Sequence, residues 1–246
     1  MKDKEFEDII FGIHSVTEAL NSGKTIDKVF LQQNGGFGLN ELEKLLKKNK
    51  VNLSYVPIQK LNRLTTKNHQ GVVAFISPVE FYDFENLVVE TIEKGETPLF
   101  LILDQLTDAR NFGAIIRTAE CTGVHGIIIQ NKGGAPVNGD TIKTSAGAVF
   151  KVPLCKVDHI KDALFYFQAS GIKVIAATEK TESLIYGTNF KDPCAIVMGS
   201  EGKGVSDSIL KLVDAKAKLP MYGEISSLNV SVACGAFLYE VVRQRL

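Results

Sequence analysis

The stretch LFLIL, residues 99–103, is apolar at every position. Further apolar runs occur at residues 126–129, 173–177 and 195–198, and longer segments of mixed composition separate them. Strands that are apolar nearly throughout, without alternation, are typical of a parallel sheet that helices cover on both faces. The sequence therefore predicts a parallel-sheet α/β domain over residues 98–246.

Helices are expected between these strands because apolar residues recur there at helical spacing. In the last of them, Val230, Ala233, Phe237, Val241 and Val242 form one apolar face. The predicted helices cover residues 111–122, about 141–148, 158–170, 205–212 and 229–245.

The first part of the chain has a different organisation. Short apolar runs alternate there with segments that favour helices. The runs lie at residues 28–31, 52–56 and 71–76, and the helical segments lie at 15–23, 39–50 and 58–67. This alternation predicts a small three-layer α/β domain over residues 1–76. The acidic and aromatic stretch at 77–97 is interpreted as a linker that contains a short helix.

The charge of the chain sums to zero, because its 246 residues include 28 basic and 28 acidic side chains. Residues 1–75 carry 11 basic and 8 acidic side chains, and residues 98–246 carry 16 and 14. Residues 76–97 carry only 1 basic side chain against 6 acidic ones. The neutrality therefore comes from one acidic stretch between two mildly basic blocks, and it does not exclude a nucleic-acid partner.

The remaining bulk features exclude several classes of protein. Four widely spaced cysteines without a C-x-x-C pair argue against a zinc site and a disulfide framework, and they fit a reducing compartment. The charged N-terminus does not look like a secretory signal, and no apolar run approaches the length of a membrane span. We therefore expect a cytoplasmic protein with no membrane segment and no bound metal.

Three polar clusters follow predicted strands, at residues 104–113, 199–204 and 219–229. Open α/β proteins bind their ligands at the carboxyl ends of parallel strands, so these clusters mark a candidate site. No G-x-G-x-x-G motif follows a strand, which removes support for a dinucleotide site. Lys203 is followed by Gly204 instead of Ser or Thr, which argues against a phosphate-binding P-loop.

Each cluster also has an ordinary structural interpretation, in which its polar side chains are helix caps, a helical ion pair or a solvated charge. The residues concerned are Asn111 as a cap, Arg117 paired with Glu120, Glu201 in solvent, and Ser227 or Asn229 as a cap. Packing alone does not require charged and amide residues in three loops at one sheet edge. Together the clusters favour a functional site.

The motifs NFGAIIR (111–117), MGSEGKG (198–204) and LPMxGxxSSLNVS (219–231), in this order, closely resemble the three motifs of the SpoU family. Members of that family are RNA 2′-O-ribose methyltransferases of the SPOUT superfamily that use S-adenosyl-L-methionine. The segments FGIHSVTEAL (11–20) and HQGVVA (69–74) resemble the ribosomal-protein-like RNA-binding domain of one branch. That branch contains the 23S rRNA guanosine 2′-O-methyltransferases.

The resemblance changes the expected fold, because chain-folding rules by themselves favour an open, unknotted sheet. It implies a trefoil-knotted parallel-sheet methyltransferase domain, preceded by a small α/β RNA-binding domain. Residues 199–204 and 219–229 would form the knotted loops around the cofactor. The resemblance also implies a homodimer with its active sites near the interface, to which the apolar face of helix 229–245 is expected to contribute.

Matching positions in the family imply a set of site residues. Catalytic roles fall on Asn111, Arg117, Glu201, Ser227 and Asn229. Binding of S-adenosyl-L-methionine falls on Thr178, Gly199, Leu219 and Leu228. Positioning of ribosomal RNA, the implied partner, falls on Lys24, Lys28, Arg63, Lys67 and His69.

Two questions stay open at the level of the sequence. The family assigns the general base to the position of Arg117, although an arginine is not expected to lose its proton in a protein. Alternatively, Arg117 clamps a phosphate and stabilises the developing oxyanion while another group takes the proton. The expected activity is methylation of a guanosine in 23S rRNA; the alternatives are a tRNA ribose methyltransferase and a non-catalytic RNA-binding assembly factor.

Overall fold

The computed structural model describes residues 9–33, 35–224 and 227–246. The chain divides into two compact units between Glu80 and Phe81. This division lies inside the stretch at 77–97 that the sequence predicted as a linker. None of the described helices is long and apolar enough to cross a lipid bilayer.

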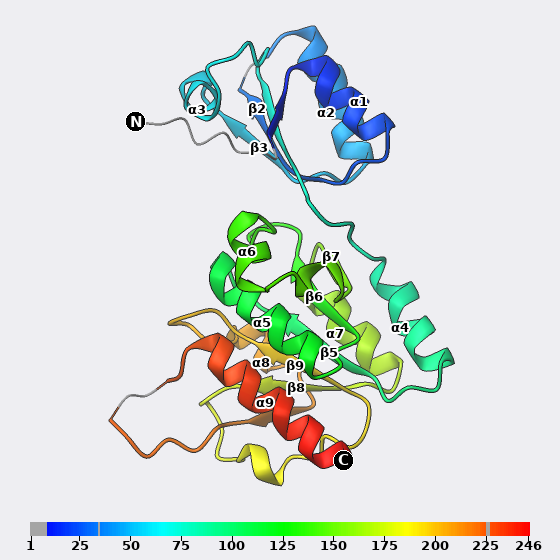
Figure 1. Ribbon diagram of the computed structural model, residues 1–246, viewed down its shortest axis with the longest axis vertical. Helices are drawn as coiled ribbons and strands as arrows, with labels where there is room; N and C mark the ends of the chain where they lie inside the picture. The colour runs from blue at the N-terminus through cyan, green and yellow to red at the C-terminus, as the bar shows by residue number, and fades with distance from the viewer. Residues whose placement is uncertain (1–8, 34, 225–226) are drawn as a thin grey trace. The chain divides into compact units, whose positions relative to one another are not determined.

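The first unit is a four-stranded sheet with three helices (Figure 1). Its strand order is β1-β4-β2-β3, with β2 and β3 parallel and the other two pairs antiparallel. The elements are β1 (Ile9–Phe11), α1 (Ile13–Asn21), β2 (Ile26–Gln32), α2 (Phe37–Lys48), β3 (Leu53–Val56), α3 (Ile58–Leu64) and β4 (Val72–Ile76).

The helices of the first unit cover both faces of its sheet, as the three-layer prediction expected. Helices α1 and α2 enclose one core cluster, in which Val16 and Leu42 pack against Val29. Helix α3 lies on the opposite face, where Leu61 packs against Phe30. Successive residues of β2 therefore point into different cores, because side chains alternate along a strand.

The second unit is built on six parallel strands in the order β10-β8-β9-β5-β6-β7. Its strands are β5 (Leu99–Leu103), β6 (Gly126–Gln130), β7 (Leu154–Val157), β8 (Lys173–Ala177), β9 (Cys194–Met198) and β10 (Ala215–Ala217). Its helices are α4 (Phe84–Glu93), α5 (Ala109–Cys121), α6 (Gly139–Thr144), α7 (Ile160–Ala169), α8 (Asp207–Leu210) and α9 (Val230–Arg245), with short turns η1 (Ala148–Phe150) and η2 (Ile185–Gly187).

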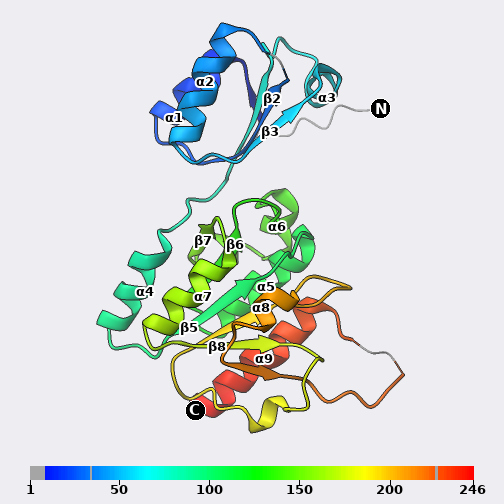
Figure 2. The same cartoon turned by 180° about the vertical axis from the view of Figure 1, so that it is seen from behind.

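Helices cover both faces of this sheet, which confirms the prediction made from the uninterrupted apolar strands. Helices α5 and α9 lie side by side on one face (Figure 1), and α7 and α8 lie on the other (Figure 2). Phe100 and Ile102 of β5 belong to the core beneath α7, together with Phe167. Every residue of β5 is buried, so both of its faces need apolar side chains.

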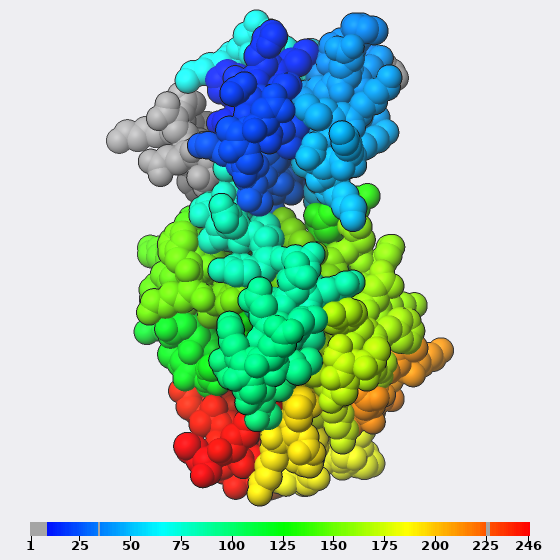
Figure 3. Space-filling view, turned by 90° about the vertical axis from the view of Figure 1, so that its right-hand side faces the viewer, coloured from blue at the N-terminus to red at the C-terminus, as the bar shows by residue number. Residues whose placement is uncertain are grey.

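The segment after Phe81 is part of the second unit and does not form a free linker. Asp83 caps α4 by accepting a hydrogen bond from the backbone N–H of Asn86 at 3.0 Å. Phe84 is buried and meets the ring of Phe167 edge to face, with ring centroids 5.0 Å apart. The helix thus lies against α7 on the surface of the second unit (Figure 3). Its acidic residues form a solvated face over an apolar contact.

Helix α9 uses its main apolar face within its own chain. Val230, Phe237 and Val241 are buried in the second unit, so the expectation that this face forms a dimer interface is wrong for these three residues. The large apolar residues that α9 exposes are instead Val232 and Tyr239, each 57% accessible.

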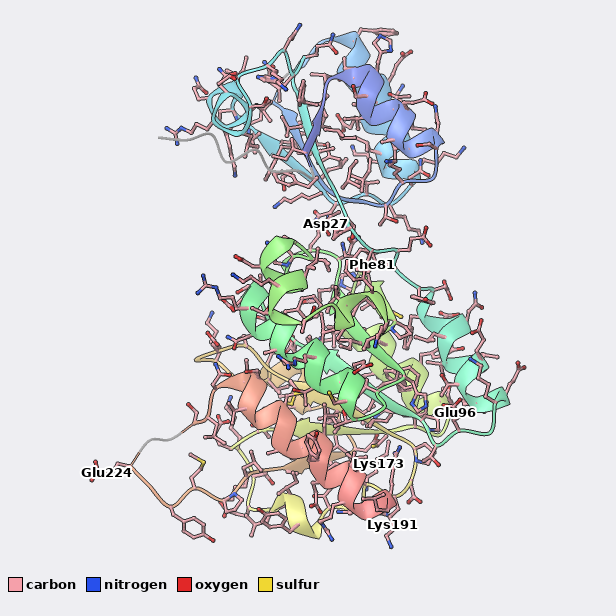
Figure 4. The ribbon with its side chains drawn as sticks, viewed as in Figure 1. Asp27, Phe81, Glu96, Lys173, Lys191 and Glu224 are labelled. Atoms are coloured by element: carbon pink, nitrogen blue, oxygen red, sulfur yellow. The ribbon has the colours of Figure 1, made fainter. Side chains whose placement is uncertain are left out.

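The end of α9 is anchored to the opposite edge of the sheet from the polar clusters. The Arg245 guanidinium donates hydrogen bonds to the carbonyls of Thr97, Phe190 and Asp192 at 2.9 Å and of Pro98 at 3.1 Å. Lys173 and Lys191 mark the same end of the unit in Figure 4. One side chain therefore joins the last helix to the starts of the two central strands.

The connection between β8 and β9 contacts the chain on both sides of the 219–229 loop. The Lys218 N–H donates to the carbonyl of Ser183, and the Ile185 N–H donates to the carbonyl of Lys218, both at 2.9 Å. Near the end of α9, Gln244 donates to the Thr188 carbonyl at 2.9 Å. These contacts are consistent with the threaded arrangement that the SpoU resemblance implies.

Candidate functional site

The first two polar clusters start at the carboxyl ends of neighbouring central strands. Leu103 of β5 is paired with Met198 of β9, and the Asp104 N–H donates to the Met198 carbonyl at 2.8 Å. The buried Asp104 carboxylate accepts a hydrogen bond from the Ser206 N–H at 2.8 Å. This aspartate therefore fixes the loop after β9 beside the loop after β5.

Asp108 caps the helix that carries the first motif. Its carboxylate accepts hydrogen bonds from the backbone N–H groups of Arg110 at 2.9 Å and Asn111 at 2.8 Å. The structural interpretation of Asn111 as the cap of α5 is therefore wrong, because the cap lies three residues earlier. The side chain of Asn111 is left to contact the loops beside it.

Asn111, Glu201 and Asn229 form a hydrogen-bonded cluster, named here the amide–carboxylate triad. Asn111 donates from Nδ2 to Oε1 of Glu201. Asn229 donates from Nδ2 to Oδ1 of Asn111 at 3.0 Å and lies 3.4 Å from the same Glu201 oxygen. One residue from each of the three clusters is therefore present in a single contact network. The triad is accessible to a substrate, since Glu201 and Asn229 are exposed.

Asn229 has a structural role as well as its place in the triad. Its Oδ1 accepts hydrogen bonds from the backbone N–H of Ser231 at 2.9 Å and from the Ser231 hydroxyl at 2.6 Å, which caps α9. The same side chain thus starts the last helix with its oxygen and holds Asn111 with its nitrogen. The structural and functional interpretations of this residue are both supported.

Arg117 and Ser227 do not join the triad within one chain. Arg117 is exposed and makes no hydrogen bond or ion pair with any described residue. Its predicted partner Glu120 instead pairs with Lys151 at 3.2 Å. Arg117 lies about 9 Å along the axis of α5 from Asn111 and on a different side of that helix. Ser227 is likewise exposed, with no polar contact among the described residues.

The loop at 199–204 closes on itself beside the triad. Ser200 and Gly204 exchange two backbone hydrogen bonds of 3.2 and 2.9 Å. A side-chain carbon at Gly199 would lie 2.0 Å from the carbonyl carbon of Gly204. The missing side chain of Gly199 therefore leaves room for the protein's own backbone at Gly204 and Val205. A larger residue there would open the loop.

The other predicted cofactor residues lie on connections that leave the same sheet edge. The buried Thr178 donates its backbone N–H to the carbonyl of Ala217 at 3.0 Å, which joins the loop after β8 to the chain that leads into Leu219. The connection after Leu219 extends outward to Glu224 (Figure 4). Leu228, close to the start of α9, is 44% accessible.

The two segments of the first unit that carry the resemblance lie next to each other. The Gly12 N–H donates to the carbonyl of Val72 at 3.3 Å, and the Ile13 N–H donates to Oε1 of Gln70 at 3.0 Å. Gly12 has φ of 88° and Gln70 has φ of 49°, so the backbone at both residues adopts a positive φ. The segments 11–20 and 69–74 are therefore one structural feature.

The predicted RNA-positioning residues of the first unit are accessible, with one exception. Lys24, Arg63 and Lys67 are exposed and Lys28 is half-buried. His69 is only 8% accessible; its Nε2 lies 2.8 Å from Oδ1 of Asn62, and its Nδ1 accepts the Gly71 N–H at 3.0 Å. The ring holds the turn at 69–71, which is a structural role that the sequence did not indicate.

Comparison with known proteins identifies the family. The SpoU rRNA Methylase family model matches residues 98–239. The chain belongs to this family. A second family model, described as RNA 2′-O ribose methyltransferase substrate binding, matches residues 9–82 and thus coincides with the first unit. The three motifs and the domain order that the sequence predicted are those of a SpoU methyltransferase, so the chain is an RNA 2′-O-ribose methyltransferase by family.

Relatives match nearly the whole SpoU chain. The Bacillus subtilis (strain 168) protein YacO, assigned to the TrmH family of tRNA/rRNA methyltransferases, is 36% identical over 239 residues, which cover 97% of this chain and 96% of YacO. The solved structure of the SpoU methyltransferase AviRb from Streptomyces viridochromogenes, in complex with AdoMet, has a TM-score of 0.61 at 25% identity and covers 96% of this chain and 90% of AviRb.

A third relative matches a smaller part of this SpoU protein. The TrmH/SpoU tRNA modifying enzyme of A. aeolicus is 34% identical, with a TM-score of 0.57, over 66% of this chain and 82% of that enzyme. These relatives therefore include one protein named for tRNA and one named for both tRNA and rRNA. Their names support the RNA methyltransferase activity without selecting one RNA.

Proposed function

We propose that this SpoU protein transfers a methyl group from S-adenosyl-L-methionine to the ribose 2′-hydroxyl of a guanosine in 23S rRNA. The observation that carries the proposal is the amide–carboxylate triad, in which one residue from each of the three SpoU motifs meets the others. The first unit supports a large RNA substrate, because its residues 9–82 match a substrate-binding family.

The loops beside the triad fit the proposed cofactor by their chemistry. Thr178, Gly199 and Leu219 would hold it through backbone amides and carbonyls at the ends of β8, β9 and β10. The accessible side chain of Leu228 would cover an apolar face of the adenine ring. When bound, S-adenosyl-L-methionine supplies the activated methyl group, and the relative AviRb has been solved with this cofactor.

Within the triad, the two amides hold the Glu201 carboxylate in one position, which orients the target ribose by hydrogen bonds. Arg117 acts best as a phosphate clamp, because a guanidinium keeps its proton and offers two parallel donors to a phosphate. The side chain is exposed and has no polar partner among the described residues, which leaves these donors ready for RNA. The clamp would also stabilise the negative charge that develops on the ribose oxygen while a group other than Arg117 takes the hydroxyl proton.

A homodimer would bring Arg117 and Ser227 to a triad that neither reaches within one chain. The exposed Val232 and Tyr239 of α9 are candidates for the contact, in place of the buried face that the sequence indicated. Mixing an inactive Arg117→Ala chain with an inactive Asn229→Ser chain tests this arrangement. We expect the mixed dimers to regain methyl transfer; if they stay inactive while dimers form, the active site belongs to one chain.

One assay tests the proposed reaction and its substrate together. The protein is incubated with methyl-labelled S-adenosyl-L-methionine and unmodified 23S rRNA, 16S rRNA or tRNA, and labelled nucleosides are mapped by mass spectrometry. We expect 2′-O-methylguanosine in 23S rRNA. Label in tRNA alone would support the alternative that the A. aeolicus relative suggests. Absence of label from every RNA would support a non-catalytic binding role.

A further inference from the structure

One face of the first sheet gathers aromatic and basic side chains in two rows. Residues directly opposite each other on paired strands share a face. Phe75 of β4 is opposite Ile9 on one side and Lys28 on the other, which makes the first row. The second row comes two residues along, where Val73 is opposite Phe11 and Phe30. This is the face on which α3 lies in Figure 1.

Helix α3 covers this face only in part. Leu61 is fully buried and Phe30 is 9% accessible, so the middle of the face is closed. Phe11 and Phe75, on β1 and β4, remain partly accessible and pack at the margin of the same cluster. Phe75 meets the Phe30 ring edge to face, with centroids 5.8 Å apart. The partly accessible rings of Phe11 and Phe75 therefore pack against the buried cluster that contains Phe30 and Leu61.

Three lysines converge on these rings. The ammonium groups of Lys28 and Lys60 lie 4.8 and 4.7 Å from the centroid of Phe30, and that of Lys67 lies 5.8 Å from the centroid of Phe11. No carboxylate among the described residues pairs with any of the three. Two ammonium groups share the Phe30 ring without a carboxylate partner among the described residues, so a ligand with negative charge would be favoured here. Lys60 had no sequence signal that singled it out.

We propose that this basic face, made of Lys28, Lys60, Lys67, Phe11, Phe30 and Phe75, binds an unpaired segment of the RNA substrate. Phosphates would take the lysines as partners, and bases would stack on Phe11 and Phe75 as they do on other sheets that bind single strands. A duplex offers no free base faces and fits such rings poorly. The inference rests on the proposed RNA methyltransferase function and specifies how the substrate is held.

The test measures binding by the full chain without cofactor, using fluorescence anisotropy. The probes are a labelled 12-nucleotide single-stranded RNA of mixed sequence and a blunt RNA duplex of the same sequence. Lys28→Gln/Lys60→Gln removes two charges from the basic face. The matched control is Lys44→Gln/Lys48→Gln, which removes two exposed charges from α2, on the other side of the same sheet. Phe75→Leu and Phe11→Leu remove rings while they keep apolar contact.

We expect Lys28→Gln/Lys60→Gln to weaken single-strand binding about 10-fold or more, and the control pair to change it less than 2-fold, at equal melting temperatures. At least one of the two phenylalanine variants should weaken it about 5- to 10-fold by loss of stacking. Equal loss in the two lysine pairs would overturn the proposal. Unchanged affinity in both phenylalanine variants, or tighter binding of the duplex, would also overturn it.

These outcomes are separate from those of the methylation assay. A protein that methylates 23S rRNA but binds single strands equally well in all variants would refute the basic face and leave the proposed reaction intact. A protein that binds single strands through this face but labels no RNA would refute the proposed reaction instead.

Discussion

The side chain of Asn229 donates a hydrogen bond of 3.0 Å to Oδ1 of Asn111, 118 residues earlier in the chain. The two residues begin adjacent helices, since Asn111 lies in the first turn of α5 and Asn229 caps α9. One hydrogen-bond network therefore joins the start of α5, the start of α9 and the loop after β9. The geometry of the proposed active site depends on how these helices are packed.

Asn229→Ser separates the two roles of this side chain. Serine keeps a capping oxygen for α9, so the free energy of unfolding should change by less than about 0.5 kcal/mol. The amide that reaches Asn111 is lost, and we expect methyl transfer to fall about 100-fold because the reacting groups are no longer aligned. Denaturant melts and single-turnover methylation check both values. Full activity in the serine variant would remove Asn229 from the active site.

Arg117→Ala should slow methyl transfer strongly without changing the fold. The side chain is exposed and contacts no described polar group, so stability should stay within about 0.5 kcal/mol of the parent protein. Loss of the clamp should lower the rate about 100- to 1,000-fold. Cofactor affinity, measured by calorimetry, should remain within a few-fold. A large loss of that affinity in the folded variant would mean that Arg117 helps to form the cofactor site.

Gly199→Ala should prevent the loop after β9 from closing, because its new carbon would overlap the backbone at Gly204. We expect the variant to lose about 1–3 kcal/mol of stability and to bind the cofactor poorly. Gly187→Ala is the matched control, since nothing lies within 4 Å of its added carbon. Thermal melts of the two variants should differ clearly. Equal melting temperatures would show that the loop tolerates a side chain at residue 199.

Ionisation of the Glu240 side chain should make the free energy of unfolding depend on pH. Its buried carboxylate accepts two hydrogen bonds of 2.8 Å from Arg243 and one of 2.7 Å from Gln244, and the Arg243 bonds hold its pKa below the ordinary value of 4.5. A lowered folded-state pKa gives stability that is present above pH 4.5 and is lost as pH falls through the lower value.

Glu240→Gln should therefore lower the free energy of unfolding by about 1–2 kcal/mol at pH 7. Below the lowered pKa of Glu240, the variant and the parent protein should have equal unfolding free energies. Urea denaturation at several pH values measures the difference. A deficit that stays constant down to strong acid would show that packing, and not the carboxylate charge, accounts for the loss.

The central strands of both sheets could be predicted from sequence, but of the four edge strands only β3 was predicted, at residues 52–56. Strand β5 was predicted at its true bounds because all five residues are apolar, as a doubly covered strand requires. The sequence analysis missed three edge strands of three or four residues, β1, β7 and β10. Lys156 interrupts the apolar pattern of β7, and Lys216 interrupts that of β10. Edge strands are often short and charged, so periodicity gives little signal for them.

The site was predicted by resemblance, and its internal contacts required the structure. Asp108 and Asn111 are both good capping residues three positions apart, so sequence gave no reason to prefer the aspartate. The burial of His69 was equally hidden, because a polar residue in a turn is ordinarily exposed. Contacts such as that between Asn229 and Asn111 depend on the packing of α5 against α9, which no local pattern records.

The hydrogen bonds from Arg245 to the carbonyls near residues 97–98 and 190–192 have a consequence for how the protein is made. They join groups up to 148 residues apart, so the second unit cannot complete its packing until Arg245 has been synthesised. The first unit has its whole sheet within residues 9–76 and is free to fold while the ribosome is still extending the chain. Synthesis would thus deliver a finished RNA-binding module before the catalytic one exists.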